Sequence, residues 1–407
     1  MRSMKAILIN CLALCLFLLP GSALVNQVQA SQQSPFDSSL YFRNSQVDLD
    51  EDVPFPEATL YYYLPLLIKA VPPLPPEWDI QVVDAATHVF SDMTDRSLRL
   101  DSSDRPRIAY GGDHLYYAHK DTAAWSIDVV DSAENVGKFA ALALDSANRP
   151  HISYYDAAAR KLKYAFYNGS TWVLQYPDPA INVGMYTSIA VDNTGQVYIS
   201  YSDAGKKRLK CAHWTGTTWE LQEVDNTSVG KYASIALDSY KHPQISYYDY
   251  YSANLNLKYA QWDGTQWNIQ VVDIVGNVGL YTSIAIDSSD NPRISYFNGS
   301  TNINNLRYTN WTGSTWEYMT VDSTGNVGWY TSLAIDSTGN PRISYYDSST
   351  GDLKYASWNG TSWTIKVVDS AGVVGLYTSL ALDTTGLPRI SYFDFTNKYL
   401  KFALKNW

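Results

Sequence analysis

Two kinds of side chain recur at fixed places in this chain and together could contact a sugar. An aromatic residue precedes a short run of small residues in six copies: Phe139, Tyr186, Tyr232, Tyr281, Tyr330 and Tyr377. An acid or amide follows at a second fixed place: Asp156, Asp203, Asp249, Asn298, Asp347 and Asp394. An aromatic ring packs on the apolar face of a sugar, while a carboxylate accepts hydrogen bonds from its hydroxyls. The pattern therefore indicates carbohydrate binding.

The same recurrence also fits a purely structural role, because residues that join neighbouring repeats must be present in every repeat. Trp329 departs from the pattern, since its place is filled elsewhere by smaller or aliphatic side chains: Lys138, Met185, Lys231, Leu280 and Leu376. We expect Trp329 to be exposed and available to a ligand. The candidate ligand-binding residues are Trp329, Tyr330, Tyr281, Tyr377, Asp347 and Asp394.

A repeat must position these residues, and a tryptophan marks its period. It recurs at Trp78, Trp125, Trp172, Trp219, Trp267, Trp316 and Trp363, with spacings of 47, 47, 47, 48, 49 and 47 residues. Within the copy that begins at Trp316, four apolar runs read as strands: WEYMTVD, TSLAID, PRISYYD and LKYASW. Each is rich in β-branched or aromatic residues and is bounded by turn residues, such as 336–340 and Asn359 with Gly360.

Four antiparallel strands repeated seven times predict an all-β chain, a seven-bladed β-propeller of four-stranded blades. The small residues of TSLAID suit the strand nearest the axis, where blades crowd most closely. The chain then opens with an outer strand, 78–84, and ends after three inner strands, roughly 378–405. We expect the first strand to complete the last blade, which leaves no open sheet edge.

The repeat of residues 78–407 resembles the tandem repeats of secreted bacterial β-propellers, including sialidase-type and lectin-like ones. The AIDSTGNPRI turn is similar to the Asp-box turn of such proteins, but it lacks the aromatic residue after the glycine. The resemblance implies the propeller fold. Propellers host many functions, so it implies little about chemistry.

An enzyme of this fold needs residues that break the repeat. A sialidase-like site would need three converging arginines and a paired Tyr and Glu. One position of the repeat is an arginine in four copies: Arg293, Arg342, Arg389 and Arg107. However, they follow the turn after the inner strand, at the opposite end from the binding loops, where Asp287, Asp336, Asp383 and Asp101 can pair with them. The divergent first blade offers Asp92, Asp95, Arg96 and Arg99, although closure of the ring explains its divergence equally well. We assign no catalytic residue.

The N-terminal segments lie outside the repeat. Residues 1–30 combine Arg2, Lys5 and an apolar run, which predicts a cleaved signal peptide and a secreted, extracellular or cell-surface protein. Residues 31–77 read as a linker with a short apolar segment and a Pro-rich spacer. The apolar run within each segment is too short to span a membrane, so we expect no membrane span in the mature chain.

Charge and cysteine content exclude several functions. The formal charge of −10 becomes −12 without the two basic residues of 1–30, which argues against nucleic-acid binding. Cys211 is the one cysteine after residue 30, in a slot held elsewhere by Tyr or Phe, and it reads as a small buried hydrophobe. No Cys/His spacing suggests a metal, and no cofactor is expected.

The sequence thus favours a secreted, monomeric, non-enzymatic binding module that recognises glycans through inter-blade loops on its top face, where several weak sites would act together. A cell-surface protein is the next ligand considered. A glycoside hydrolase or lyase with a site near the first blade is one alternative. A structural or protein-docking propeller is another.

Overall fold

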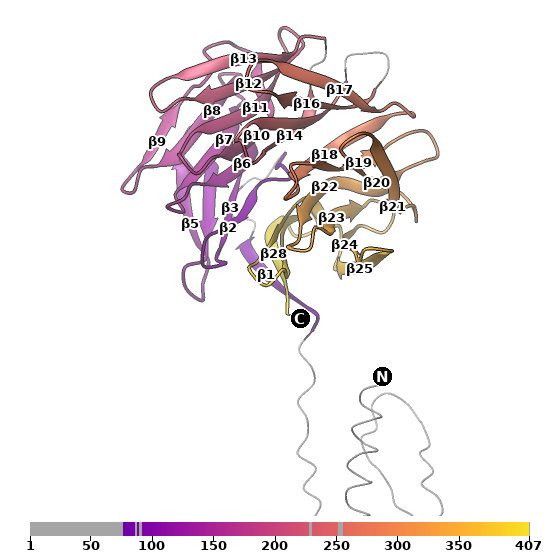
Figure 1. Ribbon diagram of the computed structural model, residues 1–407. Helices are drawn as coiled ribbons and strands as arrows, with labels where there is room; N and C mark the ends of the chain where they lie inside the picture. The colour runs from indigo at the N-terminus through magenta and orange to yellow at the C-terminus, as the bar shows by residue number, and fades with distance from the viewer. Residues whose placement is uncertain (1–75, 86–87, 89–91, 228–229, 251–254, 407) are drawn as a thin grey trace, which may run out of the picture. The chain divides into compact units, whose positions relative to one another are not determined.

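The computed structural model describes residues 76–85, 88, 92–227, 230–250 and 255–406. The predicted signal peptide and nearly all of the predicted linker lie outside these residues. The described strands form seven four-stranded antiparallel sheets set around a central axis (Figure 1). The chain is therefore a seven-bladed β-propeller, as predicted.

In blades 1 to 6 the strands run outward from the axis in chain order, and in blade 7 the outermost strand comes from the start of the propeller. Blade 1 contains β2 (Leu98–Leu100), β3 (Pro106–Gly111), β4 (Leu115–His119) and β5 (Ser126–Asp131). Blade 2 contains β6 (Lys138–Leu144), β7 (Pro150–Asp156), β8 (Lys161–Tyr167) and β9 (Trp172–Gln175). Blade 3 contains β10 (Val183–Val191), β11 (Val197–Asp203), β12 (Arg208–Trp214) and β13 (Trp219–Asp225). Blade 4 contains β14 (Lys231–Leu237), β15 (Pro243–Tyr248), β16 (Leu257–Trp262) and β17 (Trp267–Asp273).

The last three blades repeat this order. Blade 5 contains β18 (Val278–Ile286), β19 (Pro292–Asn298), β20 (Asn305–Trp311) and β21 (Trp316–Asp322). Blade 6 contains β22 (Val327–Ile335), β23 (Pro341–Asp347), β24 (Asp352–Trp358) and β25 (Trp363–Asp369). Blade 7 contains β26 (Val374–Leu382), β27 (Pro388–Asp394), β28 (Tyr399–Lys405) and, from the start of the propeller, β1 (Trp78–Ala85).

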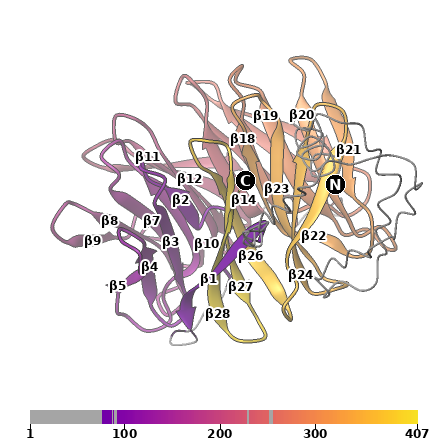
Figure 2. The same cartoon turned by 90° about the horizontal axis from the view of Figure 1, so that it is seen from below.

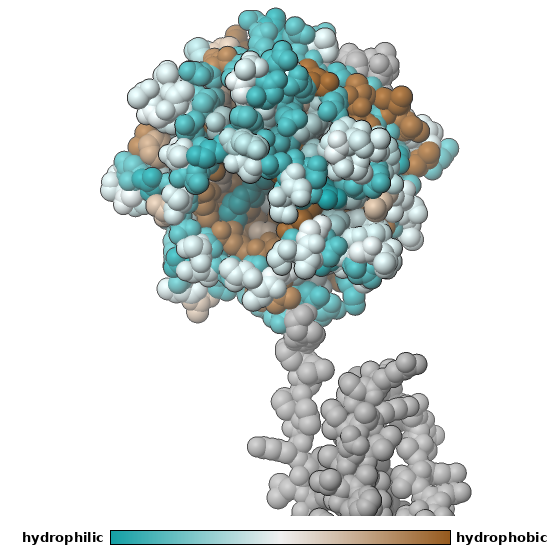
Figure 3. All heavy atoms as spheres, in the orientation of Figure 1, coloured by the Kyte–Doolittle hydropathy of each residue, from teal (hydrophilic) through white to brown (hydrophobic). Residues whose placement is uncertain are grey.

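Ring closure occurs in blade 7, where β1 pairs antiparallel with β28 from Trp78 opposite Lys405 to Ala85 opposite Tyr399. The indigo β1 lies beside the yellow β28 in both ribbon views (Figure 2). The prediction that the first strand completes the last blade is confirmed. Seen along the ring axis, the propeller surface has a central hollow (Figure 3).

Hydrophobic cores lie between neighbouring blades, and the repeating tryptophan belongs to them. Trp316 packs edge-on against Tyr259 of the preceding blade, with ring centroids 5.5 Å apart. Its indole N–H donates to the Gln270 side chain at 3.0 Å. Trp316 is thus an inter-blade contact with its polar atom satisfied.

A belt of serines joins the inner strands around the axis. The Ser332 hydroxyl accepts a hydrogen bond from the Leu380 N–H of the next blade at 2.9 Å, and Ser283 does the same for Leu333 at 3.0 Å. Such bonds let the inner strands approach closely without leaving buried N–H groups unpaired. The predicted preference for small residues on this strand is confirmed.

The turns after the inner strands also behave as expected. The Asp336 carboxylate accepts hydrogen bonds from the Thr338 and Asn340 N–H groups, both at 2.9 Å. Its second oxygen pairs with Arg342 at 2.5 Å. The arginine slot considered for a sialidase-like site therefore holds turn-stabilising ion pairs, as predicted.

Candidate functional site

The aromatic residues that recur before the small-residue run lie at bulges in the inner strands. The sequence places Tyr330 in a loop before the strand 331–336, but β22 begins earlier, at Val327. The pairing of β22 with β23 shifts register between Trp329 and Ser332. Tyr330 sits at that irregularity with φ of 54°. A bulge changes the direction in which a side chain points, and here the Tyr330 ring points toward the opening of the central channel of the propeller.

This backbone conformation is shared by all six aromatic residues of the slot. Their φ angles lie between 52° and 56°, in the left-handed region: Phe139, Tyr186, Tyr232, Tyr281, Tyr330 and Tyr377. The left-handed region costs a residue with a side chain about 1–2 kcal/mol. Strain of this kind, repeated at the mouth of a channel, marks the place as a candidate functional site.

The six rings contact one another in sequence around the mouth. Successive centroids lie 4.4 to 4.8 Å apart, in tilted or edge-on geometry. The rings therefore form one continuous wall. The sequence suggested several inter-blade sites, whereas in the structure the aromatic residues of six blades line a single cavity.

The first blade fills the seventh place in this wall with a polar segment. Asp92 also has positive φ, 51°, and its carbonyl accepts a hydrogen bond from the Phe139 N–H at 2.6 Å. Met93, Thr94 and Asp95 follow it into the channel. We name the cavity enclosed by the six rings and residues 92–95 the mouth cavity; its volume is about 130 Å³.

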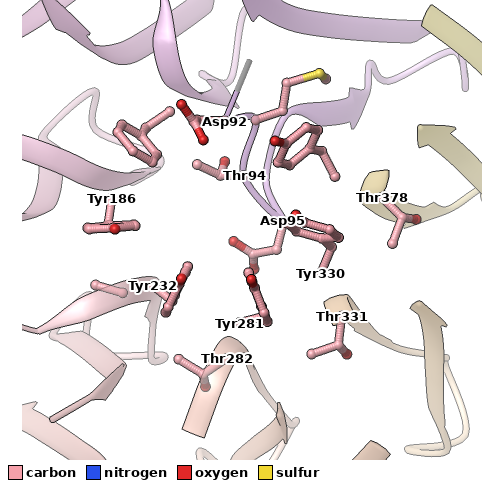
Figure 4. Close-up of a pocket in the computed structure, with 14 residues that line it drawn as sticks. Asp92, Thr94, Asp95, Tyr186, Tyr232, Tyr281, Thr282, Tyr330, Thr331 and Thr378 are labelled. Carbon is pink, nitrogen blue, oxygen red and sulfur yellow. The ribbon is translucent and has the colours of Figure 1, made fainter. Parts of the chain in front are cut away.

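Asp95 forms the floor of the mouth cavity. Its carboxylate accepts hydrogen bonds from Ser234 at 2.8 Å and Ser283 at 2.7 Å. Its carbonyl accepts hydrogen bonds from Ser332 at 2.9 Å and Ser379 at 2.8 Å. In the close-up, Asp95 lies among the labelled tyrosine side chains of several blades (Figure 4). One residue thus contacts four blades at the base of the cavity.

Two buried arginines follow the floor residue. Arg96 donates to the Ser234 hydroxyl at 3.2 Å and to the Ile284 carbonyl, while Arg99 donates to the Leu98 carbonyl at 2.7 Å. Burial lowers the pKa of Arg96, and Asp95 partly offsets that effect. Burial and the neighbouring Arg96 lower the pKa of Arg99 to about 9. Neither arginine lines the mouth cavity, so the geometry gives both a role in closing the channel.

Burial shifts the pKa values of several ionisable groups in the mouth cavity, and the tyrosine hydroxyls among them stay neutral hydrogen-bond donors. Burial, followed by interactions with Tyr232 and Tyr330, raises the pKa of Tyr281 well above its ordinary value. Burial likewise raises the pKa of Tyr330. Burial raises the pKa of Asp92, and the Lys138 ammonium, 3.8 Å away, offsets only part of this rise.

Three of the predicted ligand-binding residues, Tyr281, Tyr330 and Tyr377, line the mouth cavity. Trp329 stands beside it, half-buried, with its ring 5.4 Å from Tyr281 and 5.1 Å from Phe297. Its indole N–H donates to Asn326 at 2.7 Å. Trp329 therefore extends the aromatic wall outward.

The two predicted carboxylates are not at the site. Asp347 and Asp394 are fully buried. They pair with Lys354 at 2.7 Å and Lys401 at 2.8 Å. Both carboxylates are therefore held in ion pairs and do not line the mouth cavity, and their role in ligand binding stays a prediction.

The lysines that hold these carboxylates also meet a second acid from the preceding outer strand. Lys354 lies 3.5 Å from Asp322, which accepts a hydrogen bond from Tyr345 at 2.7 Å. An Asp–Tyr hydrogen bond of this kind occurs in all seven blades, at 2.6 to 2.9 Å. These buried networks support the loops above them.

Sequence reasoning missed several residues of the mouth cavity, namely Met93, Thr94, Thr282, Thr331 and Thr378. The last three threonines follow directly after the aromatic slot, so their recurrence was a usable signal. The Thr282 hydroxyl donates to Ser246 at 2.8 Å, and Thr378 to Ser344 at 2.7 Å, which fixes both in place. No signal in the sequence predicted that Asp92 would take the left-handed conformation.

Two further findings concern ions and membranes. In the described residues, no group of three or more His, Cys, Asp or Glu side chains could hold a metal ion. The same part of the chain has no helix with the length and hydropathy of a membrane span.

Comparison with known proteins places the fold and no more. No protein-family model matches the chain, and no curated protein matches its sequence. Among solved structures, a PL25 ulvan lyase bound to -[GlcA(1-4)Rha3S]- matches with a TM-score of 0.56 at 13% identity, covering 80% of this chain and 95% of that one.

Lectins also match in structure. The SapL1 lectin in complex with alpha methyl fucoside has a TM-score of 0.46 at 16% identity, covering 70% of this chain and 97% of that one. The six-bladed lectin of Aleuria aurantia has a TM-score of 0.47 at 13% identity, covering 71% and 98%. At 13% identity, the match to the lyase shows a shared fold and transfers no site.

Proposed function

We propose that the protein is a secreted carbohydrate-binding module whose mouth cavity holds one sugar residue of a glycan. One observation carries the proposal: six aromatic rings, each in a strained backbone conformation, converge on a single cavity with a carboxylate at its rim and another at its floor. The apolar face of a sugar packs on such rings, and its hydroxyls find acceptors and donors at Asp92 and the tyrosine hydroxyls.

The dimensions favour a single ring-sized group. A cavity of about 130 Å³ is close to the ~150 Å³ of an engineered protein cavity that holds benzene. One sugar ring can enter, while neighbouring residues of the glycan lie across the rim against Trp329. Binding of this kind is selective for an exposed or terminal residue.

Direct evidence would come from a glycan array probed with residues 76–407 and three variants. Tyr330→Asn removes a ring from the wall while keeping a residue that tolerates the left-handed region. Trp329→Ala removes the outer aromatic surface. Val271→Ala changes a side chain that is 49% exposed on the outer strand β17 and serves as the matched control.

We expect the wild type and Val271→Ala to bind the same glycans, and Tyr330→Asn to lose at least tenfold in affinity. Trp329→Ala should weaken binding to oligosaccharides more than to monosaccharides. If the wild type binds no glycan on the array, the carbohydrate proposal fails and a protein-docking role takes its place.

Hydrolysis of the bound glycan is the second candidate, because Asp92 and Asp95 share one cavity and burial raises the pKa of Asp92. A carboxyl with a raised pKa suits a general acid. Against it, both hydrogen-bonding serines already engage the Asp95 carboxylate. Release of reducing ends from an array-positive glycan, abolished in Asp92→Asn, would favour hydrolysis over binding.

A further inference from the structure

A second cavity lies between blades 3 and 4, at the opposite end of β10 from Tyr186. Its volume is about 260 Å³, and its lining includes Asp192, Gln196, Tyr198, His213, Tyr240 and Trp262. We name it the blade 3–4 cavity. It shares no residue with the mouth cavity, and none of its lining was a candidate site residue in the sequence.

The repeat shows what fills this place in the other blades. Each inner strand ends in a turn aspartate, and in six blades a side chain of the same blade donates to its outer oxygen. An arginine does so in five blades: Arg107 to Asp101, Arg149 to Asp145, Arg293 to Asp287, Arg342 to Asp336 and Arg389 to Asp383, at 2.5 to 2.7 Å. In blade 4 the donor is Gln244, 3.1 Å from Asp238.

Blade 3 lacks this donor. Tyr198 occupies the slot that holds arginine in blades 1, 5, 6 and 7. The Asp192 side chain is only 2% exposed, yet its Oδ2 atom has no hydrogen-bond partner. Its Oδ1 atom is used by the turn, through Thr194 and Gln196. A buried carboxylate oxygen without a donor is costly, and it faces a cavity.

A second substitution in blade 3 enlarges the space. In blade 5 the Tyr308 hydroxyl lies beside the arginine-slot residue Arg293, at 3.4 Å. Cys211 stands in that tyrosine slot in blade 3 and is fully buried. Blade 3 has therefore lost both the guanidinium and the phenol that fill the equivalent volume elsewhere.

The walls of the blade 3–4 cavity are aromatic. Tyr198 and His213 stack with centroids 4.3 Å apart and an interplanar angle of 4°. Tyr240, which is 75% exposed, and Trp262 also line the blade 3–4 cavity. A guanidinium is the charged group that both stacks on aromatic faces and pairs with a carboxylate through two parallel hydrogen bonds.

Charge at the cavity is compatible with a cation. Burial lowers the pKa of His213, which keeps its imidazole neutral near pH 7, and His242 also lines the cavity. Lys241 is the facing ammonium; its Nζ atom lies 3.9 Å from Asp192 Oδ2, too far for a hydrogen bond, and its side chain is 41% exposed. Lys241 can therefore move into solvent when a better donor enters.

We propose that the blade 3–4 cavity binds a guanidinium group supplied from outside the chain, with Asp192 as its carboxylate partner and the Tyr198–His213 stack as its platform. The ligand takes the position that arginine occupies within the other blades. Its source is either a small guanidinium compound or an arginine side chain of a partner protein.

Titration calorimetry at low ionic strength with two probes distinguishes these sources. Methylguanidinium presents the group alone, and N-acetyl-L-arginine N-methylamide presents it as a peptide would. Residues 76–407 are compared with Asp192→Asn, Tyr198→Arg, Tyr198→Phe and Lys241→Ala. Thermal unfolding of each variant reports whether it is folded.

The expected pattern is specific. Asp192→Asn should weaken binding of both probes about tenfold or more, because the charge-assisted pair is lost. Tyr198→Arg should abolish binding and raise the melting temperature, because the chain then supplies its own guanidinium. Tyr198→Phe should bind like the wild type, and Lys241→Ala should bind more tightly because a competing ammonium is gone. Binding of the second probe alone would assign the site to a peptide-borne arginine.

Three results would overturn the proposal. One is the absence of saturable binding of either probe to the wild type. Another is unchanged binding in a folded Tyr198→Arg variant. The third is displacement of the probes by a neutral methyl glycoside that binds more weakly to Lys241→Ala than to the wild type. Such a result would mean that the cavity binds a polyol, which would accept a hydrogen bond from Lys241, whereas a cation would displace that lysine.

Discussion

The Asp95 carboxylate accepts a hydrogen bond from the Ser283 hydroxyl at 2.7 Å, between residues 188 positions apart in the chain. Ser283 also accepts the Leu333 N–H of the next blade. The bond therefore ties the first blade to the serine belt on the far side of the axis. It couples the site to the closure of the ring.

Removing this floor should destabilise the whole propeller. Asp95→Ala leaves two serine hydroxyls without their acceptor and removes the carboxylate that lies 3.9 Å from the Arg96 guanidinium. We therefore expect a loss of about 2–4 kcal/mol in the free energy of unfolding. Asp95→Asn keeps the shape and should cost less. Chemical denaturation, with a double-mutant cycle to Ser283→Ala, measures the coupling. A cost below about 0.5 kcal/mol for Asp95→Ala would show that the floor is not a structural tie.

The positive φ of Tyr330 predicts an unusual order of substitutions. Because φ is 54° there, Tyr330→Gly should be more stable than Tyr330→Val by about 1–2 kcal/mol, although glycine is normally the weaker residue in a strand. Trp329, whose φ is not positive, is the matched control, and there valine should be the more stable. Equal rankings at the two positions would contradict the strained conformation.

Ring closure predicts that β1 is essential although it lies far from β28 in sequence. A chain starting at residue 76 should be a soluble monomer. A chain starting at residue 92 lacks β1 and exposes the edge of β28, so it should self-associate or precipitate. Size-exclusion chromatography with light scattering compares the two. A monomeric, folded chain without β1 would mean that the last blade does not need it.

The buried ion pairs make stability fall in acid. Burial alone would raise the pKa of Asp394, but hydrogen bonds from Asn397 and Lys401 more than offset this and lower it. A lowered pKa in the folded state stabilises the protein above the unfolded value, near 4, and the contribution disappears as the pH falls through the folded value.

The same shift gives a prediction for one variant. Asp394→Asn should cost about 1–3 kcal/mol at pH 7, and the difference from wild type should shrink below pH 4. Glu134→Gln, at an exposed position, should change stability by less than about 0.5 kcal/mol at either pH. Unfolding curves from pH 7 to pH 2 measure both. A difference that stays constant with pH would contradict the ionised state of Asp394.

Much of the fold could be predicted because its determinants are periodic. The tryptophan spacing, the turn at 336–340 and the unmatched strands at the two ends led to seven blades and to their closure. The arginine–aspartate turns could be predicted for the same reason, since both partners recur at a fixed separation within one blade.

The site was harder to predict because it depends on features that no single repeat contains. Side-chain type does not report that Tyr330 lies at a bulge with positive φ, so six aromatic residues seemed to belong to separate loops instead of one cavity. The polar segment 92–96 occurs in one blade only. It makes hydrogen bonds to residues of other blades that lie 138 to 284 positions away in the sequence.

The burial of Asp347 and Asp394 in ion pairs follows from a feature that the sequence did contain. A lysine recurs in the third strand of blade 6 and blade 7, at Lys354 and Lys401. A strand register that places this lysine under the loop carboxylate buries both groups as a pair. Conversely, the sequence shows Tyr198 in place of the arginine, but only the structure showed that the Asp192 Oδ2 atom was left without a hydrogen-bond donor.

The most direct test of the account is a crystal structure of residues 76–407 soaked with the glycan that binds most strongly on the array. The account predicts one sugar ring in the mouth cavity, packed against Tyr281 and Tyr330, with a hydroxyl within hydrogen-bonding distance of Asp92. Clear density for the glycan at another surface, with the mouth cavity free of sugar, would contradict it.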